Sequence, residues 1–180
     1  MEFYRDYFKL LADNIVSVDD KLLDEAVTLI KKTSSMGKKV IIAGNGGSAA
    51  IASHVAVDLT KNAGIRCVNF NEADLLTCLA NDYGYEAWLS HAIKFYGDQG
   101  DLIILISSSG ASKNILNGAT AAKDLGIKVI TLSGFSKENA LRQLGDINFF
   151  ADSKGYNIVE MTHHVWLVAM VDRIIGKIEY

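Results

Sequence analysis

Residues 43–50 of this chain read Ala43-Gly44-Asn45-Gly46-Gly47-Ser48-Ala49-Ala50. The apolar run at 39–42 before them is typical of a buried strand, and the residues at 49–59 after them predict a helix. A glycine-rich turn between a strand and a helix points backbone N–H groups and the positive end of the helix dipole at one spot. Gly46 and Gly47 allow a ligand close to the backbone, and Ser48 adds a hydroxyl. The natural occupant is a phosphate group, and the alternative is a plain tight turn.

The composition is that of an ordinary globular domain. The chain has 180 residues, 49% hydrophobic and 22% charged, which suits one domain with a sizeable core. Its formal net charge is −3 and it has no basic run, which argues against nucleic acid as a partner. The longest apolar runs, such as 102–106, are too short to span a bilayer, so we expect no membrane partner. Cys67 and Cys78 lack metal-type spacing, and we expect a reduced, cytoplasmic chain.

Strand and helix patterns alternate along the whole chain. Strands are expected at 40–43, 65–70, 101–106, 129–132 and 147–151. Helices are expected at 2–16, 49–62, 72–80, 86–96, 137–144 and 158–178. Two further helices are expected, one from a capping-box pattern at 17–20 to about residue 35 and one from the serines near 112 to residue 125. A turn is expected at 81–84. This alternation predicts an α/β fold, a three-layer sandwich in which helices cover both faces of a five-stranded parallel sheet. Ligands of such sheets bind beyond the carboxyl ends of the strands, so the turns after the first and third strands should face one crevice.

The turn after the third expected strand is rich in hydroxyl groups. Ser107, Ser108, Ser109 and Ser112 surround the start of the next helix, directly after an all-apolar strand. Hydroxyls and free N–H groups together bind a phosphate dianion without a basic side chain. This turn therefore predicts a phosphate site, and the alternative is a serine-rich cap and loop.

Several motifs, taken together, resemble one family. They are Gly44-Asn45-Gly46-Gly47-Ser48-Ala49, His54, Asp58-Leu59-Thr60, Ala80-Asn81-Asp82-Tyr83-Gly84-Tyr85, Ser107-Ser108-Ser109-Gly110 with Ser112, and Val129-Ile130-Thr131-Leu132-Ser133-Gly134. The combination resembles the sugar isomerase (SIS) domain family, in its phosphoheptose isomerase branch, over nearly the whole chain. The resemblance implies a flavodoxin-like SIS domain at 37–180, preceded by N-terminal helices at 1–36 that cover the domain or serve oligomerisation.

The resemblance also implies an activity and its site. The activity is the isomerisation of sedoheptulose 7-phosphate to a manno-heptose 7-phosphate, for heptose and surface-polysaccharide precursors. By resemblance, the phosphate is held by Ser107 to Ser109 and Ser112, and the sugar is contacted by Asn45 to Gly47, Asn81 and Asp82. The family typically forms a homotetramer with a zinc ion in each interface site; a homodimer is the other assembly that we consider.

Aldose–ketose isomerisation moves a proton between C1 and C2 through an enediol, which requires an acid and a base. In the family, a glutamate and a histidine share this work, and a second histidine and a glutamine help to bind the metal. Here His54 matches a family histidine, and Asp58 stands at the glutamate position on the same helix face. On the C-terminal helix the sequence departs from the family, because Val159 stands at the glutamine position and Leu167 at the histidine position.

A nearby set of side chains offers a substitute. Glu160 and His164 are four residues apart and share a helix face one turn earlier than the usual ligands. With His54 and Asp58 they would form a zinc set of two histidines and two carboxylates, with Asp58 and His164 as acid and base. The alternative is that Glu160 caps or pairs on the helix and the histidines pack against Trp166 or a neighbouring subunit.

The sequence thus favours a phosphosugar isomerase of the phosphoheptose type. Two other functions remain open at this stage: an isomerase of a different sugar phosphate, and a non-catalytic SIS module that binds a sugar phosphate or serves as a protein scaffold. Loss of the two C-terminal helix residues favours the module, whereas His54 and the carboxylate at Asp58 favour the enzyme.

Overall fold

The computed structural model describes residues 2–179. Its centre is a sheet of five parallel strands in the order β2-β1-β3-β4-β5. The strands are β1 (Val40–Gly44), β2 (Cys67–Val68), β3 (Leu102–Ser107), β4 (Lys128–Ser133) and β5 (Ile147–Phe150). This strand order is that of flavodoxin-like folds, so the predicted fold class is confirmed.

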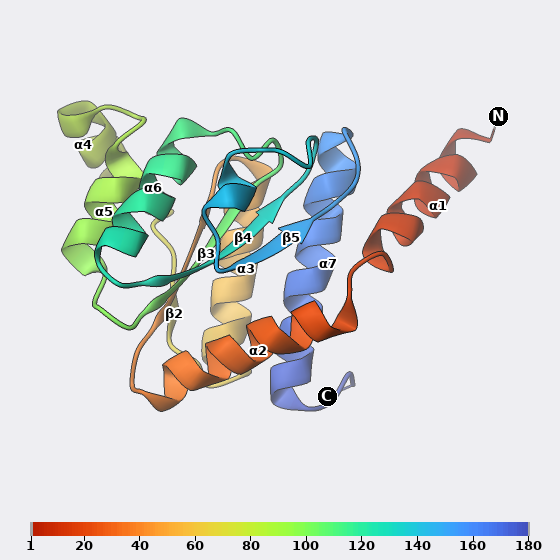
Figure 1. Cartoon of the computed structure of the whole chain (residues 1–180), viewed down its shortest axis with the longest axis horizontal. Helices are drawn as coiled ribbons and strands as arrows, with labels where there is room; N and C mark the ends of the chain where they lie inside the picture. Colours follow the sequence, from red (N-terminus) through yellow and green to blue (C-terminus); the bar gives the residue numbers. More distant parts are fainter. Residues whose placement is uncertain (1, 180) are drawn as a thin grey trace.

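Helices cover both faces of this sheet, as Figure 1 shows. One face packs against α2 (Asp20–Ser35), α3 (Gly47–Lys61) and α7 (Tyr156–Ile175), and the other against α4 (Ala73–Tyr83), α5 (Trp88–Tyr96) and α6 (Lys113–Asp124). Successive side chains of a strand point to opposite faces. In β3, accordingly, Ile104 belongs to the core under α3 and α7, and Ile103 to the core under α5 and α6. None of the helices within residues 2–179 is long and apolar enough to cross a membrane.

The first helix, α1 (Phe3–Ile15), extends away from the rest of the molecule (Figure 1). Its end is fixed to α7, because Trp166 Nε1 donates to the carbonyl of Ile15 at 2.8 Å. The aromatic side chains of Phe3, Tyr4 and Phe8 are 63–73% exposed. By contrast, α2 contributes three buried side chains to the core. The proposed division at residues 36 and 37 stays a prediction.

Local expectations were wrong at four places. The helix expected at 137–144 is only a 3-10 turn (Leu141–Gln143), because the Asn139 side chain donates to the preceding loop and occupies the residues that would start a helix. The strand expected at 65–70 has two residues in the ladder, since it pairs with β1 alone. The turn expected at 81–84 is mostly helix, and α4 ends at Gly84, whose φ of +84° suits glycine. The cap of α2 is Asp19, which accepts from the Lys21 N–H.

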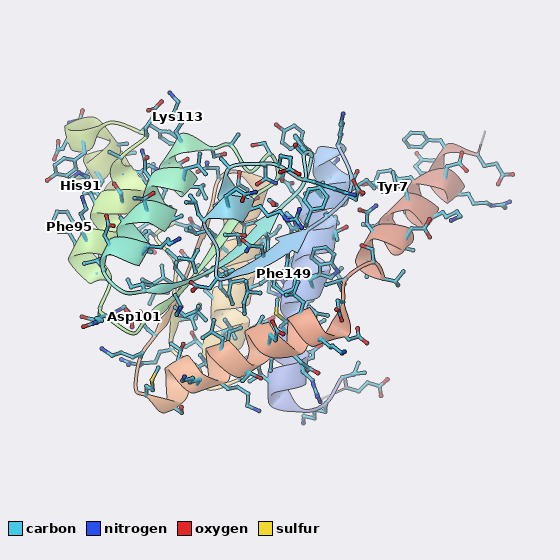
Figure 2. The ribbon with its side chains drawn as sticks, in the orientation of Figure 1. Tyr7, His91, Phe95, Asp101, Lys113 and Phe149 are labelled. Atoms are coloured by element: carbon cyan, nitrogen blue, oxygen red, sulfur yellow. The ribbon has the colours of Figure 1, made fainter. Side chains whose placement is uncertain are left out.

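A buried carboxylate ties β1 to β3 at the amino ends of the strands. Asp101 is 1% exposed, and it accepts from the backbone N–H and the Nζ of Lys39 at 3.0 and 2.6 Å. It also accepts from the N–H of Asp98 at 2.8 Å. Burial alone would lower the pKa of Lys39, but the hydrogen bonds to Asp101 and Asp98 outweigh it and the pKa is raised. Figure 2 shows Asp101 at the end of the sheet opposite to Lys113, where α6 begins.

We predict that Asp101→Ala lowers the free energy of unfolding by about 3 kcal/mol, because it leaves two backbone N–H groups without their acceptor and the partly buried Lys39 ammonium with the exposed Asp98 carboxylate alone. Urea unfolding would measure the loss. The matched variant is Asp98→Ala, whose carboxylate is 69% exposed and binds only the Lys39 ammonium, so its loss should be far smaller. Equal losses in the two variants would contradict the role of Asp101.

Candidate active site

The two polar turns lie side by side because their strands are neighbours. Gly44, the last residue of β1, pairs with Ile106 of β3, so the loops that begin at Asn45 and Ser108 leave the same edge of the sheet. From β1 the chain passes to β2 on one side, whereas β3, β4 and β5 follow on the other. This is the topological switch point at which ligands of open α/β sheets bind.

A cavity of about 110 Å³, which we call the serine cavity, lies between these loops. It is lined by Asn45, Ser48, Ile106, Ser107, Ser108, Ser109, Ser112, Tyr156 and Glu160. Ser107 Oγ donates to Ser112 Oγ at 3.1 Å, and Ser108 Oγ is buried with no hydrogen-bond partner among the described residues. Ser112 caps α6 without a side-chain bond to the helix. The unpaired Ser108 hydroxyl, close to the N-terminus of α6, suits an anion, so the cavity can take the phosphate group that the sequence predicts.

An amide pair joins the two loops. Asn45 and Asn114 exchange two hydrogen bonds, from Nδ2 to Oδ1 in each direction, at 2.9 and 2.8 Å. Tyr85 donates to the Asn45 Oδ1 at 3.1 Å. Sequence reasoning missed Asn114 and Tyr85, and also Tyr156 at the cavity. The signal for Asn114 was available, since it is a polar residue two positions after Ser112 in the first turn of a helix.

The remaining predicted sugar ligands lie outside this cavity. Asn81 and Asp82 are exposed on the last turn of α4, where Asn81 Nδ2 donates to Asp82 Oδ1 at 2.9 Å. Gly46 is exposed in the turn with φ +54°, and Gly47 begins α3. The structure therefore brings together the four serines, Ser48 and Asn45, and leaves Asn81 and Asp82 on the neighbouring surface.

The loop that carries the four serines, residues 107–112, which we call the serine loop, is fixed by contacts with the segment after β4. Gly110 has a φ of +63°, and a Cβ atom there would overlap the side chain of Asn139. The carbonyl of Gly110 accepts from the Leu141 N–H at 3.0 Å, and the Ser108 carbonyl accepts from the Gly134 N–H at 2.9 Å. The segment after β4 therefore fixes the position of the hydroxyl groups.

A second polar group lies between α3 and α7, which run side by side (Figure 1). The ring nitrogens His54 Nδ1 and His164 Nε2 are 2.7 Å apart, and the rings are nearly perpendicular at 86°. Asp58 Oδ2 lies 3.1 Å from the other ring nitrogen of His54, and Asp58 Oδ1 accepts from Asn62 at 3.1 Å. The three side chains Asp58, His54 and His164 thus form one chain, which we call the Asp–His–His relay.

The two ends of this relay differ in their surroundings. Burial lowers the pKa of His164, and the neighbouring His54 lowers it further, whereas Asp58 acts in the opposite direction. The neutral form of His164 therefore persists to a lower pH than for a free histidine. The side chain of His54 is 52% exposed, so the relay is accessible from the surface of the subunit.

Glu160 does not join the relay. Its carboxylate lines the serine cavity and lies so close to Gly47 that a Cβ atom there would overlap it. Burial raises the pKa of this carboxyl. Among residues 2–179, no three His, Cys, Asp or Glu side chains are arranged to hold a metal ion. The predicted set of His54, Asp58, Glu160 and His164 therefore does not converge on one point, and the zinc ion stays a prediction to be tested by metal analysis of the purified protein.

The residues at the two divergent family positions are parts of the core. Val159 is fully buried and packs over Gly134, and Leu167 is 1% exposed. His163 is also buried; its Nε2 lies 3.0 Å from the Ser133 carbonyl, its ring centroid is 6.0 Å from that of Trp166, and burial lowers its pKa to about 4. Of the two adjacent histidines, His163 therefore packs against Trp166, whereas His164 contacts His54.

Comparisons with known proteins agree with this geometry. The family model of the SIS domain matches residues 3–134. A phosphoheptose isomerase of Helicobacter pylori is 32% identical over 160 residues, 86% of this chain and 83% of that protein. The structure of a phosphoheptose isomerase from Neisseria gonorrhoeae covers 97% of this chain and 98% of its own at a TM-score of 0.89 and 26% identity. One from Francisella tularensis, at 23% identity, a TM-score of 0.88 and coverages of 97% and 95%, has the same fold. This chain therefore belongs to the SIS domain family and, within it, to the phosphoheptose isomerases, which are aldose–ketose isomerases of phosphosugars.

Proposed function

We propose that this chain isomerises sedoheptulose 7-phosphate to manno-heptose 7-phosphate, with the phosphate in the serine cavity and the reacting carbons at the Asp–His–His relay. One observation carries the proposal: both sites lie along the same pair of helices. His54 is seven residues after Gly47, which is about 10 Å along the axis of α3. An open-chain heptose 7-phosphate spans a distance of this order between its phosphate and C1. The relatives named as phosphoheptose isomerases support the same substrate.

The hydrogen-bond chemistry of the relay selects His164 as the group that moves the proton. An ionised carboxylate only accepts hydrogen bonds, so Asp58 holds His54 with its proton on Nε2. The Nδ1 of His54 then accepts the Nε2–H of His164, and the Nδ1 of His164 keeps a free lone pair. His164 takes a proton from C1 of the ketose and delivers a proton, exchangeable with solvent, to C2 of the enediol. O2 gains a proton from solvent and O1 loses one, which leaves the aldose carbonyl at C1.

Asp58 has a different part from the one the sequence suggested. Both of its oxygens are engaged, one by His54 and one by Asn62, so it is placed to orient the relay and not to contact the sugar. Its charge also opposes the lowering of the His164 pKa by burial and by His54, although the pKa stays below its usual value. We therefore retain Asp58 in the proton-transfer unit as the residue that fixes the tautomers.

Assembly is a further part of the proposal. The exposed aromatic side chains of α1 form an apolar surface that projects from the subunit, and His54 is exposed on the flank of α3. We propose that α1 mediates a homotetramer or homodimer in which another copy covers the relay. A cytoplasmic location is proposed with it.

Asp58→Asn should lower kcat about 100-fold or more and change KM little, because an amide does not hold His54 and His164 in the required tautomers. Initial rates with sedoheptulose 7-phosphate would measure both constants. Asp24→Asn is the matched control, since Asp24 also forms a 3.1 Å ion pair, with Arg173, but on α2. If Asp58→Asn kept the kcat of the control, the relay would not be the proton-transfer unit.

Gly110→Ala should weaken binding of sedoheptulose 7-phosphate about tenfold or more, because the new Cβ displaces the serine loop from Asn139 and its hydroxyl bonds to the phosphate are lost. Isothermal titration calorimetry would measure the affinity. Gly37→Ala is the control: its φ of +72° imposes similar strain, but a Cβ there has no neighbour within 4 Å. Equal affinities in the two variants would remove the serine loop from the phosphate site.

The combined variant Phe3→Ser, Tyr4→Ser and Phe8→Ser should reduce the oligomer to a smaller species, since it removes the apolar surface of α1 without touching the core. Light scattering coupled to gel filtration would measure the mass. Lys9→Ser changes an exposed polar side chain of the same helix and should leave the mass unaltered. A multimer that persists in the combined variant would show that assembly does not depend on these side chains.

A further inference from the structure

Glu160 is the one acidic side chain that lines the serine cavity. Tyr156, Glu160 and His164 follow one another at intervals of four residues, so they share one face of α7. Tyr156 lines the same cavity and His164 belongs to the relay. Glu160 therefore lies between the place of the phosphate and the place of the reacting carbons, where the middle of a sugar chain would pass.

The glycine turn leaves room for this carboxylate. The three nearest neighbours of a Cβ atom built on Gly47 are all atoms of the Glu160 carboxylate, with Oε1 at 2.8 Å. Gly47 is the first residue of α3, so the carboxylate lies at the positive end of that helix dipole, which stabilises it. The absence of a side chain at Gly47 thus makes room for the Glu160 carboxylate and also allows the tight turn.

The carboxylate of Glu160 has no hydrogen bond or ion pair within residues 2–179. A partly buried carboxylate without a donor is costly, so this position is suited to a ligand that brings one. The oxygens of a phosphate monoester dianion cannot do so, because they carry no proton, and they repel the carboxylate. A sugar hydroxyl can, because it donates one hydrogen bond.

We propose that Glu160 is a specificity-determining residue that accepts a hydrogen bond from a hydroxyl group of the sugar chain, next to the bound phosphate. The inference rests on the proposed function, because it takes a phosphosugar as the ligand of this cavity. It assigns Glu160 a contact with the substrate in place of the predicted contact with a metal ion. Glu160 then selects sugar phosphates over a phosphate monoester without hydroxyl groups, such as methyl phosphate, since both ligands meet its negative charge but only the sugar supplies a donor.

The test compares two ligands, methyl phosphate and sedoheptulose 7-phosphate, by isothermal titration calorimetry at a pH where both are dianions. We define the discrimination ratio as the Kd for methyl phosphate divided by the Kd for the sugar phosphate. Glu160→Gln should lower this ratio about tenfold, because the variant removes repulsion from both ligands and weakens the hydrogen bond to the hydroxyl of only one. Glu25→Gln makes the same chemical change on the exposed face of α2 and should leave the ratio unaltered.

A second pair of variants tests whether Gly47 acts through Glu160. Gly47→Ala should lower the discrimination ratio in the natural background, because the new methyl group displaces the carboxylate. In a Glu160→Ala background the same change should have no further effect on the ratio. Thermal unfolding of each variant would show that the fold persists.

Two outcomes would overturn the inference. One is an unchanged ratio in Glu160→Gln; if both ligands then bound more tightly by the same factor, Glu160 would be only a source of repulsion. The other is the absence of sugar-phosphate binding to the natural chain. Turnover of sedoheptulose 7-phosphate by the natural chain with an unchanged ratio in Glu160→Gln would leave the proposed function standing and remove the role of Glu160 alone.

Discussion

The ladder between β1 and β3 is the constraint on which the rest of the structure depends. It brings the glycine turn and the serine turn to one edge of the sheet, although they are some sixty residues apart in the chain. Asp101 fixes the opposite end of the same strand pair through Lys39. Because α3 starts directly at the glycine turn, the position of β1 also decides where His54 and Asp58 lie. A parallel sheet thus places the phosphate site and the proton-transfer site with one set of backbone hydrogen bonds.

Much of this could be predicted from the sequence. Alternating strand and helix patterns gave the layer order, and the two small-residue turns gave the cavity at the switch point. Local errors arose where tertiary contacts decide the backbone. Hydrogen bonds of the Asn139 side chain to the preceding segment prevent the expected helix from forming. The strand β2 is short and pairs with a neighbouring strand on one side only. A window of sequence does not contain such contacts.

The functional side chains were harder to place than the fold. Helical spacing correctly put Glu160 and His164 on one face of α7, but it could not show that these two side chains contact α3 at positions two turns apart. Glu160 meets the start of α3 at Gly47, whereas His164 meets His54 two turns later. The predicted four-ligand set therefore separates into a cavity carboxylate and a relay. Val159 and Leu167 are core residues, so the proton-transfer group of this chain has to come from another position on α7.

The most direct test of the account is a nuclear magnetic resonance measurement on the natural chain with sedoheptulose 7-phosphate in deuterated water. Proton transfer through an enediol exposes the moved proton to solvent at the acid–base group. We predict an aldose product that carries deuterium at C2. Resonances that broaden on binding, with neither product nor deuterium incorporation, would contradict it and would make this chain a binding module.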